Sequence, residues 1–283
     1  MSEAGNLITG DFRAALLQTT STNQMTENIG AVSQMIREAA GAGADFIMMP
    51  ETVGLMERRS RAVFEKVCEE ESDPSLAAFR ALAAEFGKWL LIGSLAIKIS
   101  DNKLANRSFL IDGQGDVIAR YDKIHMFDVN LPNGESYRES KNYQPGSDAV
   151  VADTPWGPLG MSVCYDLRFP HLYRALAQAG ARMLTVPAAF TRTTGQAHWH
   201  ILLQARAIET GCFVFAPAQC GTHADGRETF GHSLVVAPWG EILADGGAAP
   251  GIITADIDMS RVDKARTAVP SLDHDRKYSG PQS

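Results

Sequence analysis

The chain has 283 residues, of which 45% are hydrophobic and 21% are charged, a composition typical of a soluble protein with a substantial core. Its formal net charge of −7 and its lack of a basic run argue against a nucleic-acid-binding protein and favour small-molecule chemistry. No apolar run reaches membrane-spanning length, and the opening MSEAGNLITG lacks the pattern of a signal peptide. We therefore expect a cytoplasmic protein that does not contact a membrane.

The first half of the chain alternates amphipathic stretches with short apolar runs. Helical spacing of apolar residues predicts helices over 28–42 and from Pro74 to about Phe86, and the charged region 55–71 is expected to be a lid-like loop with some helix. A hairpin is indicated at 112–115, so the sheet should be partly antiparallel. Strands are predicted over residues 12–18, 46–49, 89–99, 104–111 and 117–121.

Two of these strands are followed directly by a charged residue. Pro50 ends the strand over 46–49, so Glu51 stands just outside its carboxyl end, where open α/β sheets keep their reacting groups. Lys123 follows the strand over 117–121 in the same way. Taken singly, each residue is more typical of a solvated surface than of a catalytic site.

The second half begins with a polar stretch over 131–146, which predicts a long loop, and such loops in compact enzymes tend to carry function. Further on, GARMLTVPAAF repeats the pattern of GADFIMMPETV, with Ala188 in the place of Glu51. This echo is consistent with two similar α/β halves that face each other. Helices are predicted over 169–177, 197–211 and a short segment near the end, and strands near Met161 and Val163 and over 183–186, 212–217, 231–238, 241–244 and 252–257.

Cys164 lies in the predicted turn between a buried strand and a helix that begins near Pro170. A side chain on such a turn is pushed out above the sheet, and the backbone N–H groups that follow it point toward whatever is bound there. Both features suit a nucleophile, although a cysteine is also a small residue common in cores. The other cysteines are Cys68, Cys212 and Cys220, and because no C-x-x-C pair occurs we expect four free thiols.

Glu51, Lys123 and Cys164 each lie just past a separate predicted strand end, as a site assembled at one edge of a sheet requires. The segments VCYDLRFP, MMPE and YDKIHMFD resemble the three catalytic motifs of the nitrilase superfamily of carbon–nitrogen hydrolases. HMFDVNLPNGESYRES, HWHILLQARAIE and GHSLVVAPWGEILA are similar more narrowly to its Nit-type amidases, which include the deaminated glutathione amidases and the ω-amidases. The resemblance extends from Phe12 to Arg276.

The resemblance implies an α/β fold, a four-layer α-β-β-α sandwich with mixed sheets, and a triad of Glu51, Lys123 and Cys164. A second glutamate would fall on Glu139, and the backbone N–H of Tyr165 would contact the developing oxyanion. No Pro- or Ser-rich linker divides the chain. We therefore expect a flexible N-terminus over 1–10, one carbon–nitrogen hydrolase domain over 11–277 and a polar tail over 278–283.

The physical logic of the triad can be stated independently of the resemblance. An ammonium such as Lys123 favours a nearby thiolate, and Glu51 acts as general base toward the thiol of Cys164. Attack on an amide leaves a thioester that water hydrolyses. Positioned proton transfer contributes roughly 100- to 10,000-fold and one oxyanion donor about as much, so the mechanism requires no metal or cofactor.

The resemblance also bears on the substrate and on assembly. Arg168, four residues past the nucleophile, would present a planar fork to the carboxylate of an acidic substrate. Such a substrate would be a 2-oxo acid amide, either deaminated glutathione or 2-oxoglutaramate, although a salt bridge from Arg168 to Asp166 is the competing interpretation. Members of this fold associate through the helices next to the nucleophile, so we expect a homodimer.

Three alternatives stay open at this point. Cys164 could pair with a histidine such as His171 or His198 in another type of cysteine hydrolase, which leaves Lys123 and Glu51 unexplained. The fold could serve as a catalytically silent interaction scaffold, or the enzyme could be another amidase or a nitrilase of the superfamily. The chain also reads His198-Trp199-His200 where Nit-type sequences usually read His-Trp-Glu, and two histidines at i and i+2 of a helix lie about 200° apart, too far to share a metal ion.

Overall fold

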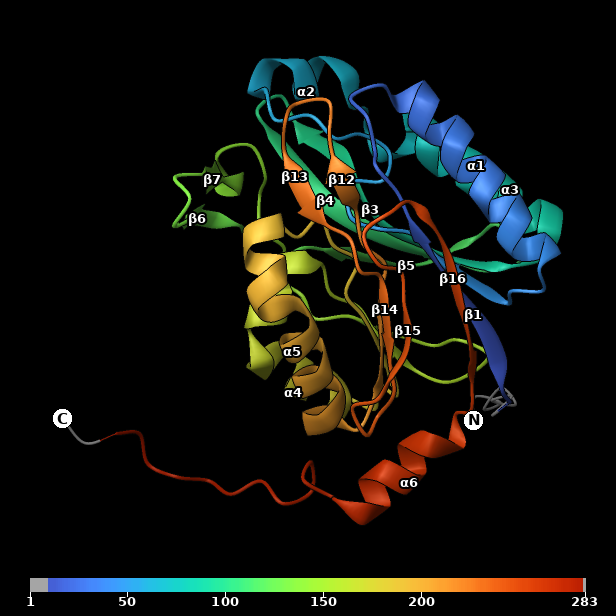
Figure 1. Ribbon diagram of the computed structural model, residues 1–283, viewed down its shortest axis with the longest axis vertical. Coiled ribbons are helices and arrows are strands. Elements are labelled where there is room, and N and C mark those ends of the chain that lie inside the picture. The colour runs from blue at the N-terminus through green and yellow to red at the C-terminus, as the bar shows by residue number, and fades with distance from the viewer. Residues whose placement is uncertain (1–9, 282–283) are drawn as a thin grey trace.

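The computed structural model describes residues 10–281, in which two six-stranded mixed sheets face each other. Helices cover the outer face of each sheet, which gives four layers (Figure 1). The α-β-β-α sandwich predicted from the sequence is therefore confirmed. The expectation of a flexible N-terminus falls almost entirely on residues 1–9, which lie outside the described range.

The first sheet has the strand order β16-β1-β2-β3-β4-β5. Its central strand β2 runs parallel to β1 and β3, whereas the outer pairings are antiparallel. The strands are β1 (Phe12–Gln18), β2 (Phe46–Met48), β3 (Trp89–Ser100), β4 (Lys103–Ile111), β5 (Val117–Asp122) and β16 (Gly251–Ile257). The outer helices are α1 (Met25–Gly41) and α3 (Pro74–Phe86).

The second sheet has the order β15-β14-β11-β10-β9-β8, with parallel pairing on both sides of β10. The strands are β8 (Val151–Ala152), β9 (Leu159–Gly160), β10 (Met183–Thr185), β11 (Phe213–Ala216), β14 (Leu234–Val236) and β15 (Ile242–Asp245). Its outer helices are α4 (Pro170–Gln178) and α5 (Arg192–Thr210). Both β2 and β10, which carry the echoed motifs, have parallel neighbours on both sides. Residues of both strands share the core between the sheets, so the two halves face each other.

Smaller elements connect the layers. They are α2 (Ser60–Lys66), α6 (Ser260–Ala268), the hairpins β6 (Asp128–Asn130) with β7 (Ser136–Arg138) and β12 (Cys220–Thr222) with β13 (Glu228–Phe230), and 3₁₀ turns at Glu70–Ser72, Glu139–Lys141 and Cys164–Arg168. None of the described helices is long and apolar enough to cross a membrane.

The alternation of side chains along β1 explains how one strand serves two interfaces. Ala14 and Leu16 point into the core between the sheets, while Ala15 and Leu17 point outward against α1 and α3, so all four are fully buried. A strand buried on both faces reads as a continuous apolar run, which is why β1 was predictable from the sequence.

Several sequence predictions need correction. The stretch 131–146 is not a plain loop, because it contains β7 and a 3₁₀ turn at Glu139–Lys141. The helix predicted over 197–211 starts earlier, at Arg192, where the Thr191 hydroxyl accepts the N–H of Thr194 and caps it. The strand predicted near Met161 and Val163 is replaced by the shorter β9, which ends at Gly160. The hairpin of β12 and β13 was not predicted.

Gly93 allows β3 to pack closely against the backbone that precedes Glu51. A Cβ on Gly93 would lie 2.0 Å from the carbonyl oxygen of Met49 and 2.5 Å from the carbonyl carbon of Pro50. Only glycine allows so close an approach of two backbones. The N–H of the next residue, Ser94, donates to the carbonyl of Pro50, and the Ser94 hydroxyl accepts the N–H of Thr52, so β3 holds the turn on both sides of Glu51.

Candidate active site

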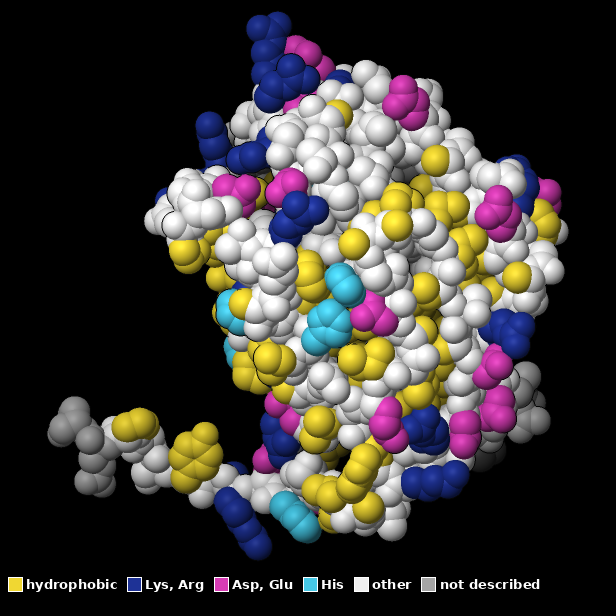
Figure 2. All heavy atoms as spheres, in the orientation of Figure 1, with side chains coloured by type: hydrophobic (Ala, Val, Ile, Leu, Met, Phe, Trp, Pro, Cys, Tyr) yellow, Lys and Arg dark blue, Asp and Glu magenta, His cyan; other side chains and the backbone are white. Residues whose placement is uncertain are grey.

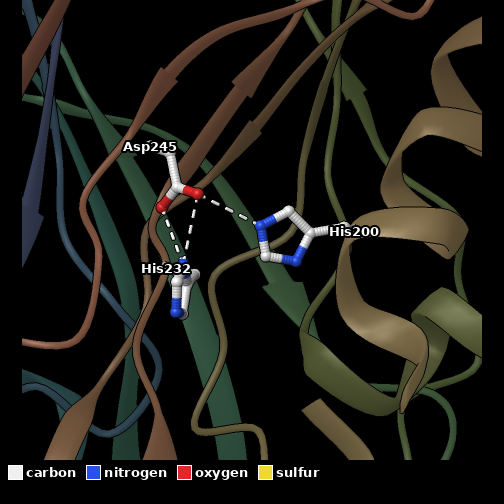
Figure 3. Close-up of side chains that lie close together, drawn as sticks. All are labelled: His200, His232 and Asp245. Carbon is white, nitrogen blue, oxygen red and sulfur yellow. Dashed lines mark hydrogen bonds and ion pairs between the residues drawn. The ribbon is translucent and has the colours of Figure 1, made fainter. Parts of the chain in front are cut away.

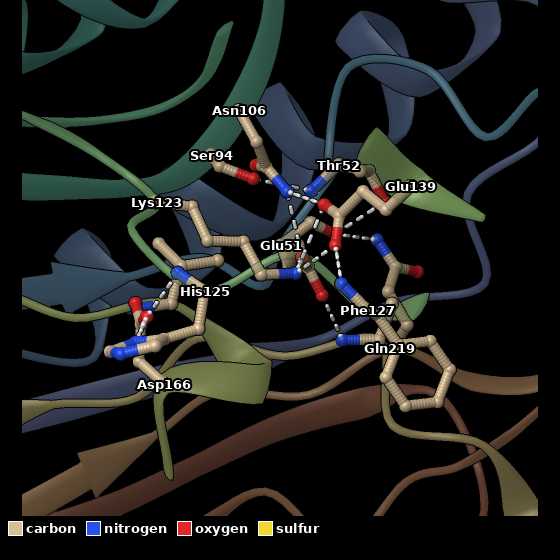
Figure 4. A network of polar contacts seen from close by, with 12 residues as sticks. Glu51, Thr52, Ser94, Asn106, Lys123, His125, Phe127, Glu139, Asp166 and Gln219 are labelled. Carbon is tan, nitrogen blue, oxygen red and sulfur yellow. Dashed lines mark hydrogen bonds and ion pairs between the residues drawn. The ribbon is translucent and has the colours of Figure 1, made fainter. Parts of the chain in front are cut away.

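The ends of strands from both sheets meet at one buried polar network, drawn in Figure 4. Glu51 follows β2 and Lys123 follows β5, both in the first sheet. Cys164 follows β9 in the second sheet and lines the same cavity. The structure therefore brings together the three residues that the sequence singled out.

Lys123 lies between two carboxylates. Its Nζ is 2.9 Å from Oε1 of Glu51 and 2.9 and 3.0 Å from the two carboxylate oxygens of Glu139. The Lys123 side chain is only 2% exposed. The Nδ2 group of Asn106 also donates to both carboxylates, at 2.9 and 3.0 Å, and the backbone N–H of Phe127 donates to Glu139. Glu139 is thus placed where it fixes the ammonium group.

Glu51 is held from the opposite half of the sandwich as well. Its Oε2 accepts the backbone N–H of Ala189 at 2.8 Å, just past the echoed strand β10. The backbone carbonyl of Glu51 accepts Nε2 of Gln219 at 3.0 Å. The residue that follows Ala188, the equivalent of Glu51 in the second half, therefore donates its backbone N–H to Glu51 and orients the carboxylate.

Cys164 begins the 3₁₀ turn Cys164–Arg168 in a left-handed backbone conformation, with φ of 50°. A non-glycine residue in this region is uncommon, and such residues are enriched at functional sites. The N–H of Cys164 donates to the carbonyl of Pro187 at 2.9 Å, which closes the turn. No described residue accepts the N–H of Tyr165, so this donor is available to a bound molecule.

Asp166, expected from the sequence only as a partner of Arg168, connects the segments that carry Lys123 and Cys164. Its buried carboxylate accepts the hydroxyl of Tyr121 at 2.7 Å, the N–H of His125 at 3.0 Å and the N–H of Val163 at 2.9 Å. Tyr121 and His125 lie two residues before and after Lys123. One carboxylate therefore ties the segment carrying Lys123 to the residue that precedes Cys164.

The electrostatics of the triad favour a neutral thiol in the resting site. Burial and the negative charge of Glu51 raise the pKa of Cys164 well above its usual value, and these effects outweigh Lys123, which lowers it. Burial acts to raise the pKa of Glu51 as well, but Lys123 overcomes it and the net shift is downward, so Glu51 is ionised. Lys123 acts in the expected direction, but burial and Glu51 have the larger effect on the pKa of Cys164. A neutral thiol beside an ionised carboxylate requires general-base chemistry.

The network opens into a cavity of about 380 Å³. Glu51, Lys123 and Cys164 line this cavity, together with the aromatic residues Phe127, Tyr137 and Phe190. Four cationic side chains also line it, namely Arg58, Arg138, Lys141 and Arg227. A cavity of this size suits a small ligand, and its cationic lining suits an anion.

Arg227 was missed by the sequence analysis, as was Arg58. The guanidinium carbon atoms of Arg227 and Arg58 lie 5.4 and 5.0 Å from the centre of the Tyr137 ring, and neither arginine forms a salt bridge with a described residue. Nε of Arg227 is buried without a hydrogen-bond partner in the described part of the chain. The only sequence signal for Arg227 is its place in a turn, THADGRE, that resembles any surface loop.

Arg168 lies elsewhere. It is not among the residues that line the cavity; its guanidinium carbon is 5.4 Å from the centre of the Phe190 ring and its Nη2 is 3.3 Å from Nδ1 of His198. Neither the expected carboxylate site nor the competing salt bridge to Asp166 is seen in this arrangement. His171 and His198, the alternative partners of Cys164, are also not among the lining residues.

Comparison with known proteins agrees with this geometry. The sequence matches the carbon–nitrogen hydrolase family over residues 13–267. A deaminated glutathione amidase of Yersinia enterocolitica is 41% identical over 94% of this chain and 93% of its own length. The NitFhit protein of C. elegans has a structure that superposes with a TM-score of 0.88 at 35% identity, over 95% of this chain and 66% of the longer one.

A third relative is an amidase from Nesterenkonia, with a TM-score of 0.77 at 27% identity over 94% of this chain and 98% of its own. In that protein a glutamate-to-glutamine mutant was captured after acrylamide had added to the active-site cysteine. The chain described here belongs to the carbon–nitrogen hydrolase family, and its fold is that of the nitrilase superfamily. It is a hydrolase that acts on the carbon–nitrogen bond of small-molecule amides.

The charge balance around Cys164 generates a prediction about its reactivity. In the wild type, iodoacetamide should alkylate Cys164 only as the pH rises above the ordinary thiol pKa of 9.0. In Glu51→Gln the midpoint of this pH profile should fall, because a negative charge next to the thiolate is removed while Lys123 remains. Peptide mass spectrometry over a pH series gives both profiles.

Glu57→Gln is the matched control, since Glu57 lines the same cavity but is engaged by Arg59 and Lys66. Its profile should equal that of the wild type. An unchanged or higher midpoint in Glu51→Gln would show that Glu51 does not govern the charge of the thiol.

Proposed function

We propose that this enzyme hydrolyses the amide of a small 2-oxo acid, with deaminated glutathione as the foremost candidate and 2-oxoglutaramate as the second. The observation that carries the proposal is the Glu51–Lys123 ion pair at 2.9 Å, buried beside Cys164 on a left-handed turn. The name of the Yersinia relative and the cationic cavity support the choice of substrate. A cytoplasmic location is part of the same proposal.

The reaction begins with the carbonyl carbon of the amide next to Sγ of Cys164. Glu51 takes the thiol proton as the C–S bond forms, so no free thiolate accumulates. Negative charge moves to the carbonyl oxygen, where the ammonium of Lys123 and the free N–H of Tyr165 stabilise it. Each such donor contributes on the order of 100-fold to the rate.

Collapse of this intermediate breaks the C–N bond. Glu51 returns the proton to the leaving nitrogen, and the amine departs while the acyl group stays on Cys164 as a thioester. Glu51 then takes a proton from water, the water oxygen attacks the thioester, and the thiol recovers its proton as the carboxylic acid leaves. Glu139 stays outside the covalent steps and acts as a positioning residue, because its contacts are with Lys123, Asn106 and the Phe127 backbone.

An acidic substrate needs a local cation, because the chain as a whole carries a net charge of −7. Arg227 is the better candidate: it lines the cavity, has no acidic partner among described residues and keeps a buried Nε unpaired. Arg168, the candidate from the sequence, does not line the cavity. It would affect the substrate only through its contact with Phe190, which lines the cavity, or after its side chain had rotated. We therefore propose that Arg227 binds the 2-oxo carboxylate.

The homodimer is the last part of the proposal. The apolar face of α4 expected to contribute is used in the core, where Leu172, Tyr173 and Leu176 are buried. An exposed apolar patch lies instead on α5, where Ile201 and Ile208 are 68% and 59% exposed and stand seven residues apart on one face. Such a patch suits self-association.

Activity measurements test the covalent mechanism. Cys164→Ala should abolish hydrolysis of a 2-oxo acid amide, and Glu51→Gln should block it as well. Substrate added to the wild type should leave an acyl mass on Cys164 in a rapid-quench experiment. Cys212→Ala serves as the control, because Cys212 is buried at the carbonyl of Ala181, away from the cavity. Comparable activity in Cys164→Ala would refute the mechanism.

A comparison of two arginines tests the charge of the substrate. Arg227→Met should lose roughly 2 to 5 kcal/mol in kcat/KM on a 2-oxo acid amide and little on its uncharged counterpart, and Arg227→Lys should lose less. Arg168→Met and Arg168→Lys are measured alongside. A loss on the acidic substrate in the Arg168 variants alone would restore the assignment made from the sequence. Equal losses on both substrates would show that neither arginine binds the carboxylate.

The oligomeric state is measured by light scattering. The wild type should show the mass of a dimer at micromolar concentration, and the double variant Ile201→Lys, Ile208→Lys should shift it toward a monomer by placing charge on the patch. A monomer mass for the wild type would refute the dimer.

A further inference from the structure

Three side chains able to bind a metal ion meet outside the catalytic cavity (Figure 3). His200 comes from α5, His232 from the segment between β13 and β14, and Asp245 from the end of β15. Nε2 of His200 is 3.1 Å from Oδ2 of Asp245, and Nδ1 of His232 is 2.9 Å from Oδ1. Their ligand atoms all lie within 4.8 Å of one another.

The backbone around His232 is held in an unusual conformation that keeps this arrangement in place. His232 has a φ of 53°, in the left-handed region that a histidine rarely adopts. Its N–H donates to the carbonyl of Gly247 at 2.6 Å, and its own carbonyl accepts Nε1 of Trp199 at 2.7 Å. The ring stacks on Phe230 with centroids 4.4 Å apart. The site is therefore preorganised.

Asp245 is fixed as well. Its Oδ1 accepts the N–H of Gly247 at 2.9 Å. All three side chains keep between a quarter and two fifths of their surface exposed, so an ion and its water ligand can reach them. Figure 2 shows histidine side chains beside an acidic one on the surface of the molecule.

The donor set and the spacing fit zinc. Two imidazole nitrogens and a carboxylate oxygen are common zinc ligands, with bonds of about 2.0 to 2.2 Å. In a tetrahedron of such bonds the ligand atoms stand about 3.3 to 3.6 Å apart. With Oδ2 of Asp245 as the carboxylate ligand, its contacts of 3.1 Å to His200 and 3.2 Å to His232 need to lengthen by only a few tenths of an ångström. The two imidazole nitrogens lie within 4.8 Å of each other, and a bound ion would set their separation to the edge of the tetrahedron.

We propose that His200, His232 and Asp245 bind one divalent first-row transition-metal ion, zinc foremost, with water in the fourth position. His198 and His200 were expected to point apart on their helix and so not to share an ion. They do point apart, since His198 contacts Arg168. His200 instead finds its partners in residues 32 and 45 positions later. The bound ion would tie α5 to the turns around β14 and β15 and so stabilise the folded chain.

Zinc binding is measured in the full chain after chelator treatment, by calorimetry and by thermal unfolding. Every variant is made in a Cys164→Ala background, so that the active-site thiol cannot bind the ion. The parent should bind one equivalent of Zn²⁺ and gain thermal stability with it. His200→Ala and His232→Ala should each weaken binding by about 100-fold or more and abolish the gain. Co²⁺ in place of Zn²⁺ should give the visible absorption of a tetrahedral site in the parent.

His274→Ala is the matched control, because His274 is an exposed histidine that does not belong to the cluster. It should bind Zn²⁺ as the parent does. The proposal is overturned if the parent binds no Zn²⁺ at millimolar concentration, or if His200→Ala and His232→Ala bind it as tightly as the parent. A loss of stability in these variants without any effect of the metal would also overturn it, and would assign the three residues to a hydrogen-bonded cluster.

Discussion

The site depends on one buried ammonium group. Lys123 is 2% exposed, and burying a charge so completely is costly unless it is paired. Glu51 and Glu139 supply two carboxylates to one cation, and Asn106 spans both of them with a single amide. Burial and the negative charge of Glu51 raise the pKa of Cys164 above its usual value, whereas Lys123 acts to lower it. In the proposed mechanism Glu51 then serves as the base.

The position of this group depends on contacts between the two halves of the sandwich. Glu51 belongs to the first sheet but is oriented by the N–H of Ala189 from the second. Asp166 belongs to the second half and holds Tyr121 and His125 of the first. Glu51 and Cys164 come from different halves, so the packing of one sheet on the other sets the distance between them. If they act as base and nucleophile, as proposed, the core between the sheets serves catalysis as well as stability.

The sequence was sufficient for those parts of the site that follow a local pattern. Glu51, Lys123 and Cys164 each stand directly after a strand, and a buried strand is recognisable from its apolar run. Asp166 and Arg227 follow no such pattern, because their roles come from contacts with distant segments. Asp166 contacts Tyr121, 45 residues away, and Arg227 reaches the Ala189 carbonyl and the Tyr137 ring. The role of Arg168 stays a prediction: it is close to Cys164 in the chain, but its side chain contacts His198, which no local pattern indicates.

The raised pKa of Cys164 also bears on how the enzyme survives between turnovers. Peroxides and other cellular oxidants react with thiolates far faster than with thiols. A nucleophile that remains a buried thiol until a substrate arrives is therefore shielded from irreversible oxidation to sulfinic and sulfonic acids. In the proposed mechanism Glu51 supplies the base for hydrolysis, and together with burial it also raises the pKa of Cys164, which would slow oxidation of the sulfur when no amide is present.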